Sequence, residues 1–414
     1  MKIAVLIKQI PRFEAMTMTA DGRLQREGIE LDLNAYCRRA VAKGVDLARD
    51  SGGTCTAFTL GPESAEDVLR EAVAWGADKG LLISDMAFAG SDSLATSRAL
   101  AAALTQEGPF DLILAGRNSV DADTGQVGPA LAELLDLPFL AGVRKLDIAD
   151  GLITAACEHD DGWLHAQVAL PAVLSVAERL CAPAKAGPEE RAGVDGDCIH
   201  RLSAADLGPG PWGAVGSPTQ VGEIRALDDI PRAGRRLTEI SELAALLRAR
   251  GALDDSQPES AGIVPETKDG PTIAVIIEPG RERLGRELCG AAARLGGHVV
   301  GLLQEAVDGD DLGSWGCNSA VLFDGALAEE DMAQGVSDWA RDHAPWAILA
   351  PGTLWGREVA ARAAAALGAG LVGDAVDLEV RDGRLIAWKP AFGGKLVAAI
   401  TASSPIQIAT VRAG

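Results

Sequence analysis

Aromatic and basic residues are both scarce in this sequence. Phe, Trp and Tyr make up 4% of the 414 residues, and 38 Lys and Arg stand against 59 Asp and Glu, for a net charge of −21. Nucleic acids and anionic membrane surfaces are bound through clustered Lys and Arg. We therefore expect no nucleic-acid partner. The acidity is compatible with docking to a basic protein surface, or with solubility alone.

Long apolar runs are also missing. The apolar run at residues 3–7 is too short for the core of a signal peptide, and no small-residue cleavage site follows it. No other run approaches the length of a membrane span. We expect a cytoplasmic protein without membrane insertion.

The cysteines lack the spacing of a redox or metal motif. They are odd in number and scattered, which is typical of reduced, mostly buried thiols. Cys-x-His pairs at Cys157 and Cys198 each lack a second pair of ligands, so no metal site is expected. The seven cysteines are Cys37, Cys55, Cys157, Cys181, Cys198, Cys289 and Cys317.

Common catalytic motifs are absent as well. The sequence has no P-loop, no GxGxxG after a strand, and no nucleophile elbow. No Ser/His/Asp or Cys/His set has a supporting context. We expect no catalytic residues of the chain's own.

The sequence does contain an internal repeat. Four segments of the N-terminal half recur in the same order, with similar gaps, in the C-terminal half, which indicates two related domains joined end to end. The pairs are KIAVLI near Ala4 with TIAVII near Ala274, AWGADKGLLISD (74–85) with SWGCNSAVLFDG (314–325), DLILAG (111–116) with WAILAPG (346–352), and 134–153 with 365–386.

Each copy alternates short apolar runs with amphipathic helical patterns such as residues 63–77 and 91–104. This alternation predicts an α/β fold with two doubly wound, mostly parallel sheets. Ligands of such sheets sit at the carboxyl ends of the strands.

The region between the copies differs in composition. Residues 181–197 and 207–220 are rich in Pro and Gly and predict an extended arm, 237–253 predicts a short amphipathic helix, and 254–271 is a polar linker. We therefore predict three parts: a nucleotide-binding domain at 1–200, an arm, helix and linker at 201–270, and a second domain at 271–414.

One strand-to-helix turn is unusually long. Such connections take about two to six residues, whereas the first copy places NSVDADTGQ there. Between matched positions the first copy is about four residues longer than the second, which has an ordinary helix start in TLWGREVAARAAA.

This turn predicts a nucleotide site. The free N–H groups of a helix start favour a phosphate, and Thr124 and Gly125 would let a ligand approach closely. Asp121 and Asp123 would accept hydrogen bonds from a ribose or an adenine amino group, and Asn118, Ser119 and Gln126 would add neutral donors. The alternative is a simple cap, in which Asp123 caps the helix and Gln126 completes a capping box.

These residues also resemble a known family. AVLIKQIP (4–11), LDLNAYCRRAV (31–41), TLGPESAEDVLREAVAWGAD (59–78), GSDSLATSRALA (90–101) and residues 111–138 resemble the beta subunit of electron transfer flavoproteins. Residues 367–414, ending in SSPIQIATVRAG, resemble domain I of the alpha subunit. The resemblance implies two Rossmann-like domains.

The resemblance implies a cofactor and its contacts. Beta subunits of this family bury AMP or, in the electron-bifurcating branch, a second FAD, and the pattern D-x-D-T-x-Q-V-G-P is more similar to the FAD-holding branch. Carried over by position, the nucleotide would contact Leu6, Asn34, Ala35, Tyr36, Cys37, Leu60, Gly116, Arg117, Asn118, Ser119, Val120, Asp121, Asp123, Thr124, Gly125, Gln126 and Val127.

Two departures from the family matter. Alpha subunits continue beyond ATVRPG into a domain that holds the redox-active FAD, whereas this sequence ends at ATVRAG, so a partner chain would supply that FAD. The family's leucine-containing recognition loop is replaced here by APAKAGPEERAG (182–193).

The implied function is electron transfer from a flavin-dependent dehydrogenase to a downstream acceptor, within a hetero-oligomer that includes the dehydrogenase, a separate FAD-domain subunit, or both. Whether the chain itself counts as an enzyme is left open. The alternative is a non-redox adaptor subunit of a flavin dehydrogenase complex with a purely structural AMP. A third possibility is electron transfer through a flavin in the first copy alone.

Overall fold

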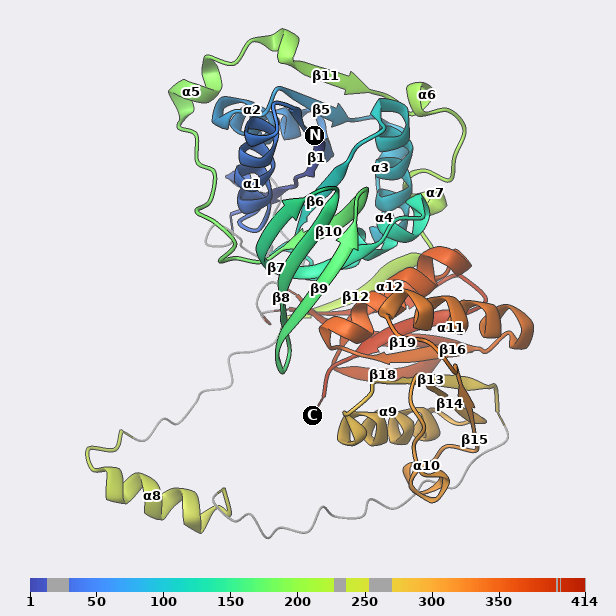
Figure 1. Cartoon of the computed structure of the whole chain (residues 1–414). Helices are drawn as coiled ribbons and strands as arrows, with labels where there is room; N and C mark the ends of the chain where they lie inside the picture. Colours follow the sequence, from blue (N-terminus) through green and yellow to red (C-terminus); the bar gives the residue numbers. More distant parts are fainter. Residues whose placement is uncertain (13–29, 227–235, 253–269, 392–393, 395, 414) are drawn as a thin grey trace.

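The computed structural model describes residues 1–12, 30–226, 236–252, 270–391, 394 and 396–413. Two α/β lobes lie one above the other (Figure 1). We call the nine-stranded sheet with its helices the first lobe, and the six-stranded sheet with its helices and an attached four-stranded sheet the second lobe. The predicted α/β class with two mostly parallel sheets is confirmed.

The sheet of the first lobe has the strand order β11-β5-β4-β1-β6-β10-β7-β8-β9. From β11 to β7 all neighbours are parallel, and β8 and β9 add an antiparallel hairpin. Its elements are β1 (Lys2–Leu6), α1 (Cys37–Asp50), β4 (Thr54–Leu60), α2 (Glu66–Trp75), β5 (Lys79–Ile83), α3 (Ser93–Glu107), β6 (Leu112–Gly116), α4 (Val127–Leu135), β7 (Phe139–Ala149), β8 (Leu152–His159), β9 (Gly162–Ala169), β10 (Ala172–Val176) and β11 (Ile199–Leu202).

The central strands are apolar throughout because both faces of the sheet are covered. Alternate residues of β1 face opposite cores: Ile3 and Val5 pack with α1 and α2, whereas Ala4 packs with α3 and α4. Helix α3 begins where Asp92 accepts hydrogen bonds from the N–H groups of Leu94 and Ala95, each at 3.0 Å.

The parallel sheet of the second lobe repeats this order as β15-β14-β13-β16-β21-β17. Strand by strand, it corresponds to β5-β4-β1-β6-β10-β7 of the first lobe, which is the repeat seen in the sequence. Its elements are β13 (Ile273–Ile277), α9 (Glu282–Leu295), β14 (Val299–Leu303), α10 (Gly309–Trp315), β15 (Ser319–Leu322), α11 (Glu329–His343), β16 (Ala347–Pro351), α12 (Leu354–Leu367), β17 (Gly370–Ala375) and β21 (Gln407–Val411).

The segment between the repeats contributes a strand to each lobe. β11 pairs in parallel with β5 of the first lobe, while β12 (Thr219–Ala226) pairs antiparallel with β20 of the second. β12 thereby joins β18 (Asp377–Arg381), β19 (Arg384–Ala391) and β20 (Leu396–Ala402) in the four-stranded sheet. The predicted boundaries at 200 and 270 stay a prediction, and most of the predicted linker lies outside the described residues.

The predicted helix at 237–253 is present as α8 (Ile240–Ala249), and none of its residues is buried. It lies apart from both lobes in Figure 1. Among the described residues, no helix combines the length and apolar character needed to cross a bilayer. The part of the chain that the structure describes also contains the short elements β2 (Gln9–Pro11), β3 (Leu31–Leu33), α5 (Pro188–Ala192), α6 (Ala204–Leu207), α7 (Gly213–Gly216) and three 3₁₀ turns at Glu63–Ala65, Met86–Phe88 and Gly196–Cys198.

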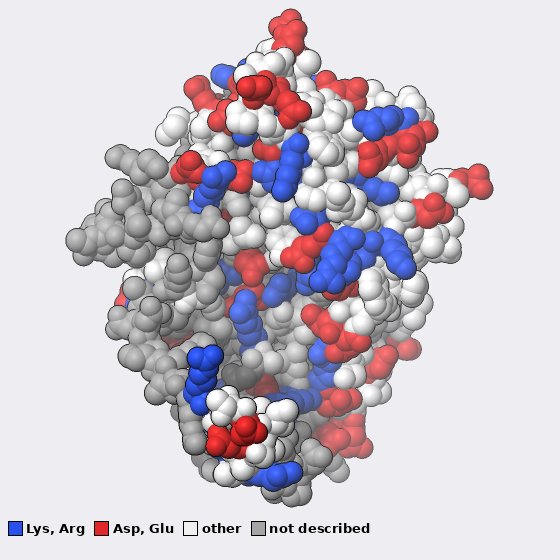
Figure 2. All heavy atoms as spheres, turned by 90° about the vertical axis from the view of Figure 1, so that its left-hand side faces the viewer, with Lys and Arg blue, Asp and Glu red and all other residues white. Residues whose placement is uncertain are grey.

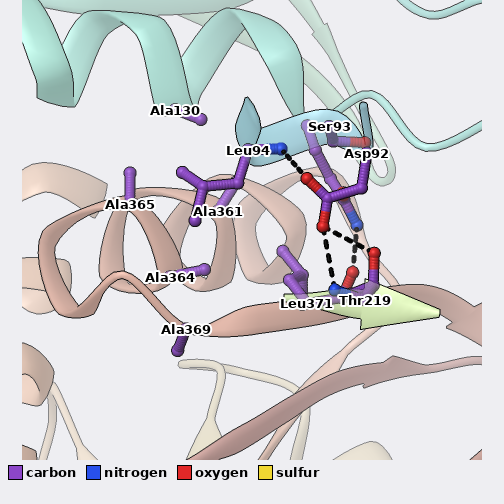
Figure 3. Close-up of a pocket in the computed structure, with 11 residues that line it drawn as sticks. Asp92, Ser93, Leu94, Ala130, Thr219, Ala361, Ala364, Ala365, Ala369 and Leu371 are labelled. Carbon is purple, nitrogen blue, oxygen red and sulfur yellow. Dashed lines mark hydrogen bonds between the residues drawn. The ribbon is translucent and has the colours of Figure 1, made fainter. Parts of the chain in front are cut away.

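The lobes meet along a seam between α4 and α12. Five of the eleven residues that line a small cavity there are alanines, including Ala130 of α4 and Ala361 of α12 (Figure 3). At its edge Asp92 also accepts hydrogen bonds from the backbone N–H (2.9 Å) and the hydroxyl (2.7 Å) of Thr219, which ties β12 to the first lobe. On the outer face shown in Figure 2, acidic and basic side chains are intermixed over the described residues.

Candidate functional site

The predicted site lies where the strand order of the first lobe reverses direction. β1 has β4 on one side and β6 on the other, and the carboxyl ends of the two strands at such a reversal are the usual ligand position in sheets of this kind. Leu6, Leu60 and Gly116 are the last residues of β1, β4 and β6. A side chain on Gly116 would come within 2.8 Å of the Cβ of Tyr36, so the segment 34–37 packs directly on this strand end.

Asn34 anchors the loop that follows β6. It is fully buried, and its side-chain amide donates to the carbonyl of Asn118 at 2.8 Å while its oxygen accepts from the N–H of Val120 at 3.3 Å. Its amide also lies 3.2 Å from the Cys37 sulfur. Segments 34–37 and 117–127, predicted from separate stretches of sequence, are thus brought together.

A lysine that the sequence analysis missed holds the middle of the loop. The Lys8 ammonium, two residues beyond β1, donates to both carboxylate oxygens of Asp121, at 2.8 and 3.0 Å, and lies 3.3 Å from the Ser119 hydroxyl. Burial alone would raise the pKa of Asp121, but the Lys8 charge and hydrogen bond hold that pKa below its ordinary value. Asp121 is therefore ionised, and its ion pair with Lys8 holds the middle of the loop against the end of β1.

Asp123 is not the cap of α4, so the capping-box alternative is wrong. It adopts a left-handed backbone (φ +46°), and its carboxylate accepts from the Asn118 side chain. Gly125, also left-handed at φ +63°, turns the chain again before the helix. The residue preceding α4 is Gln126, and no side chain caps the helix. The first turn of α4 thus keeps N–H groups that no side-chain cap occupies.

Gln126 instead joins the two lobes. Its buried side-chain amide donates to the carbonyl of Leu371 on β17 at 3.3 Å. A side chain on Gly373 would lie 2.9 Å from that amide nitrogen, so the glycine leaves room for it. Thr124 lies at the same contact, because its Cα would be 3.8 Å from a Cβ atom added to Gly373.

The loop and the second lobe enclose a small cavity. Two of the polar atoms around it are buried and have no hydrogen-bond partner: the side-chain oxygen of Asn118 and the Nε of Arg357. Unpaired buried polar groups are uncommon and call for a specific explanation. The cavity is lined by Arg117, Asn118, Gly125, Pro129, Phe139, Ala141, Ser175, Leu354, Arg357 and Glu358.

Charged residues of the second lobe face the same loop. Asp374, which is 1% exposed, accepts from Arg357 at 2.6 Å and from Arg412 at 3.1 Å. Arg412 also lies 3.9 Å from Asp123 across the seam. Nothing in the analysis of the sequence singled these residues out, although Asp374 and Arg412 lie within the stretch that resembles the alpha subunit.

The titratable residues beside the loop are poorly suited to nucleophilic chemistry. Burial raises the pKa of the Cys37 thiol, so it stays protonated. Burial and a hydrogen bond to Glu178 raise the pKa of Tyr36. Neither side chain is activated for attack on a ligand.

Comparison with known proteins relates this geometry to a family. A model of the electron transfer flavoprotein domain matches residues 21–196 and 281–414. The electron transfer flavoprotein subunit beta of Thermoanaerobacterium thermosaccharolyticum is 37% identical over 188 residues, which cover 44% of this chain and 70% of that protein. Protein FixA of Rhizobium meliloti is 32% identical over 277 residues, 61% of this chain and 94% of FixA.

A third relative is named as part of a larger assembly. The caffeyl-CoA reductase-Etf complex subunit CarD of Acetobacterium woodii is 32% identical over 254 residues, covering 60% of this chain and 96% of CarD. Because the family model spans more than half of the sequence, this chain belongs to the electron transfer flavoprotein family.

Proposed function

We propose that this chain is a fused electron transfer flavoprotein subunit that holds an adenine nucleotide, AMP or FAD, in its first lobe. Residues 1–200 would be the beta-like domain, 201–270 the arm and linker, and 271–414 the counterpart of alpha domain I. The chain would help to pass electrons from a flavin-dependent dehydrogenase to a downstream acceptor, in the cytoplasm, as part of a hetero-oligomer in which a partner chain supplies the redox FAD.

The observation that carries this proposal is the loop 117–126 at the reversal point of the first sheet. It ends in a helix start without a side-chain cap, and it surrounds the unpaired oxygen of Asn118. A helix start of this kind favours phosphate, and an unpaired carbonyl oxygen suits a ribose hydroxyl or an adenine amino group. The residues present therefore fit an adenine nucleotide.

The roles of the chain's own residues follow from their contacts. The Lys8–Asp121 pair and Asn34 hold the loop in place. Asn118, Gly125 and the start of α4 would bind the nucleotide. A bound FAD would supply the electron-transfer chemistry, whereas AMP would be structural. Neither case requires catalytic residues of the chain's own, because the protein only positions such a cofactor.

Partner assembly is supported by the names of the relatives. CarD is named as a subunit of a reductase complex, and the acryloyl-CoA reductase electron transfer subunit gamma of Anaerotignum propionicum is 36% identical over 181 residues. Co-purification with a flavin-containing chain would test this part of the proposal.

The nucleotide is tested by denaturing the purified chain and identifying what it releases by mass. We expect about one AMP or FAD per chain. FAD would favour a chain that carries electrons itself, and AMP alone would favour the carrier with a partner flavin or the adaptor. Release of neither, from protein incubated with both, would contradict the proposal.

A pair of variants makes the test specific to the loop. Gly125→Val places a branched side chain at a left-handed position in the loop, whereas Gly368→Val does so at φ +60° after α12. Both should cost about 1–2 kcal/mol of stability. Only Gly125→Val should lose the nucleotide, and equal retention in the two variants would argue against this loop.

A further inference from the structure

Two of the seven cysteines meet in the second lobe. All seven are free thiols, and the sulfur atoms of Cys289 and Cys317 lie 3.0 Å apart. The two residues are 28 positions apart in the chain, so the fold and not a local motif brings them together. Cys289 lies on α9, and Cys317 lies in the turn between α10 and β15. The proposed function uses neither thiol.

The turn that carries Cys317 packs directly on α9. A side chain on Gly316 would lie 3.3 Å from the Cβ of Ala293 and 3.8 Å from the carbonyl oxygen of Cys289. The N–H of Cys317 donates to the carbonyl of Leu312 at 3.1 Å, which holds the turn against the end of α10. Both cysteines pack in the same apolar cluster of the second lobe. The contact between the sulfurs therefore follows from how the helix and the turn are packed.

The first lobe has an alanine at the position that matches Cys317. The repeated segments 74–85 and 314–325 align without a gap, and Ala77 stands opposite Cys317. Ala77 is 4% exposed and packs in the apolar core of the first lobe. A small apolar side chain is thus enough for this place in the fold, and packing alone does not require a thiol there.

The two thiols differ in exposure and in proton affinity. Cys289 is 0% exposed, whereas Cys317 is partly exposed. The hydrogen bond between the sulfurs raises the pKa of Cys289, together with burial, and lowers the pKa of Cys317 against the effect of burial. The thiolate is the form of cysteine that reacts with oxidants. An oxidant in solution therefore meets Cys317 first, with the protonated thiol of Cys289 directly behind it.

We propose that Cys289 and Cys317 are a dithiol pair that a hydroperoxide converts into an intrachain disulfide. With hydrogen peroxide, the Cys317 thiolate attacks one oxygen, the O–O bond breaks, and Cys317 becomes a sulfenic acid while hydroxide leaves. The Cys289 sulfur then attacks the Cys317 sulfur, the S–O bond breaks, and the Cys289 proton leaves with that oxygen as water. The two thiols lose two electrons, and the peroxide is reduced to two waters once the hydroxide takes up the proton that Cys317 released on ionising.

The disulfide would fasten α9 to the turn before β15 and would close a loop that contains β14 and α10. Such a cross-link restricts the unfolded chain, so the oxidised protein should resist unfolding better than the reduced protein. The inference does not depend on the proposed function, because neither cysteine lies in the loop 117–126 or lines the cavity beside it.

Hydrogen peroxide treatment of the purified full-length chain tests the proposal. After treatment the chain is denatured, its remaining thiols are alkylated, and the intact mass and the peptides are measured. We expect two fewer alkylated thiols, an intact mass lower by two hydrogen atoms before alkylation, and a peptide pair that joins Cys289 to Cys317. Dithiothreitol should restore both thiols.

The rate of reaction should also distinguish the pair from another partly exposed cysteine. The sulfur of Cys181 contacts the carbonyl of Arg39 and not a second thiol, and burial raises its pKa. Cys289 and Cys317 should therefore become unavailable to alkylation at least about tenfold faster than Cys181.

Three variants make the test specific. Cys317→Ala copies the residue of the first lobe and should fold without forming the cross-link. Cys289→Ala should leave Cys317 to take up oxygen as far as sulfinic acid, because no thiol is present to resolve the sulfenic acid. Cys181→Ser is the control and should still form the disulfide. In urea, the oxidised parent chain should unfold at a higher midpoint than the reduced chain, and Cys317→Ala should show no such difference.

Four results would overturn the inference. Cys289 and Cys317 could both stay available to alkylation while Cys181 is oxidised. The cross-links could join other cysteines or two separate chains. Cys317 of the parent chain could reach sulfinic acid while Cys289 stays a thiol. The oxidised and reduced parent chains could unfold at the same urea midpoint, which would show that the disulfide fastens nothing. None of these results bears on nucleotide release, so the proposed function stands or falls separately.

Discussion

The two lobes share one strand order, but the connection from strand to helix at the reversal point of the sheet is long and uncapped in one lobe and short and capped in the other. In the first lobe ten residues, 117–126, connect β6 to α4, and no side chain caps the helix. In the second lobe two residues, 352–353, connect β16 to α12, and Thr353 caps the helix by accepting from the N–H of Gly356 at 3.1 Å.

The second lobe also fills its reversal point with protein. Thr353 donates to the carboxylate of Glu278, just beyond β13, at 2.6 Å. The tip of the β8–β9 hairpin completes the closure, because Asp160 accepts from the N–H of Leu354 at 2.7 Å and Asp161 pairs with Arg281 at 2.6 Å. One copy of the repeat thus places a long loop and an uncapped helix start at this position, whereas the other uses the same place to contact the β8–β9 hairpin of its neighbour.

The largest effect should come from Asn34→Ala beside the long loop. It removes a buried side chain that satisfies the carbonyl of Asn118 and the N–H of Val120. We expect a loss of about 2–3 kcal/mol in urea unfolding, and loss of the bound nucleotide measured by mass after denaturation. A stable variant that still releases a full equivalent of nucleotide would show that Asn34 does not shape the nucleotide site.

Thr353→Ala at the reversal point of the second lobe should affect stability alone. The loss of the cap and of the bond to Glu278 should cost about 1–2 kcal/mol. Because the first lobe is untouched, nucleotide content should match that of the parent chain. A drop in nucleotide content would mean that the two reversal points are coupled.

The carboxylates of the two reversal points should respond oppositely to pH. The pKa of Asp121 is lowered, since the Lys8 pair outweighs burial, so its contribution to stability is present above its unfolded pKa and is lost as pH falls. The pKa of Glu278 is raised by burial, so its contribution is present below its unfolded pKa and is lost as pH rises through the folded one.

Urea unfolding across pH would check this. Asp121→Asn should reduce the loss of unfolding free energy as the pH falls into the acid range. Glu278→Gln should reduce the loss of unfolding free energy as the pH rises through the folded-state pKa of Glu278. The same change of slope in both variants would refute the contrast.

The smallest effect is expected from Asp161→Ala at the hairpin tip. Its side chain is 77% exposed, so the ion pair with Arg281 should contribute about 0.5 kcal/mol or less. Added salt should reduce even that difference in melting temperature. A loss comparable to that of Thr353→Ala would show that the hairpin, and not the cap, closes the reversal point of the second lobe.

The sequence predicted the scaffold better than the contacts between its halves. Continuous apolar runs such as IAVLI and IAVII identify buried parallel strands, so the repeat and the class of fold were readable. The long turn could be located because its counterpart in the second copy is shorter. Residue type alone makes Asp123 a possible helix cap. It does not reveal the left-handed backbone of Asp123 and Gly125, which turns the chain away from that role.

The missing parts of the candidate site have a common cause. Arg357 and Arg412 lie beside the loop only because the two lobes pack along α4 and α12, and no local pattern encodes that packing. Lys8 is different: a lysine two residues beyond a buried strand and a half-buried acid in the facing loop form a recognisable pair. The roles assigned to the predicted nucleotide contacts stay predictions.

The strand β12 has a consequence for how the two halves are joined. It follows the first lobe in the chain but pairs with β20 of the second lobe. The N-terminal part of the chain, up to the linker, therefore already contributes a strand to a sheet of the second lobe. Severing the chain between residues 252 and 270 would leave two fragments that still share a sheet. A gene split at that point, with both pieces made together, should yield a tight heterodimer, so the peptide link would set a one-to-one ratio of the halves rather than supply their attachment.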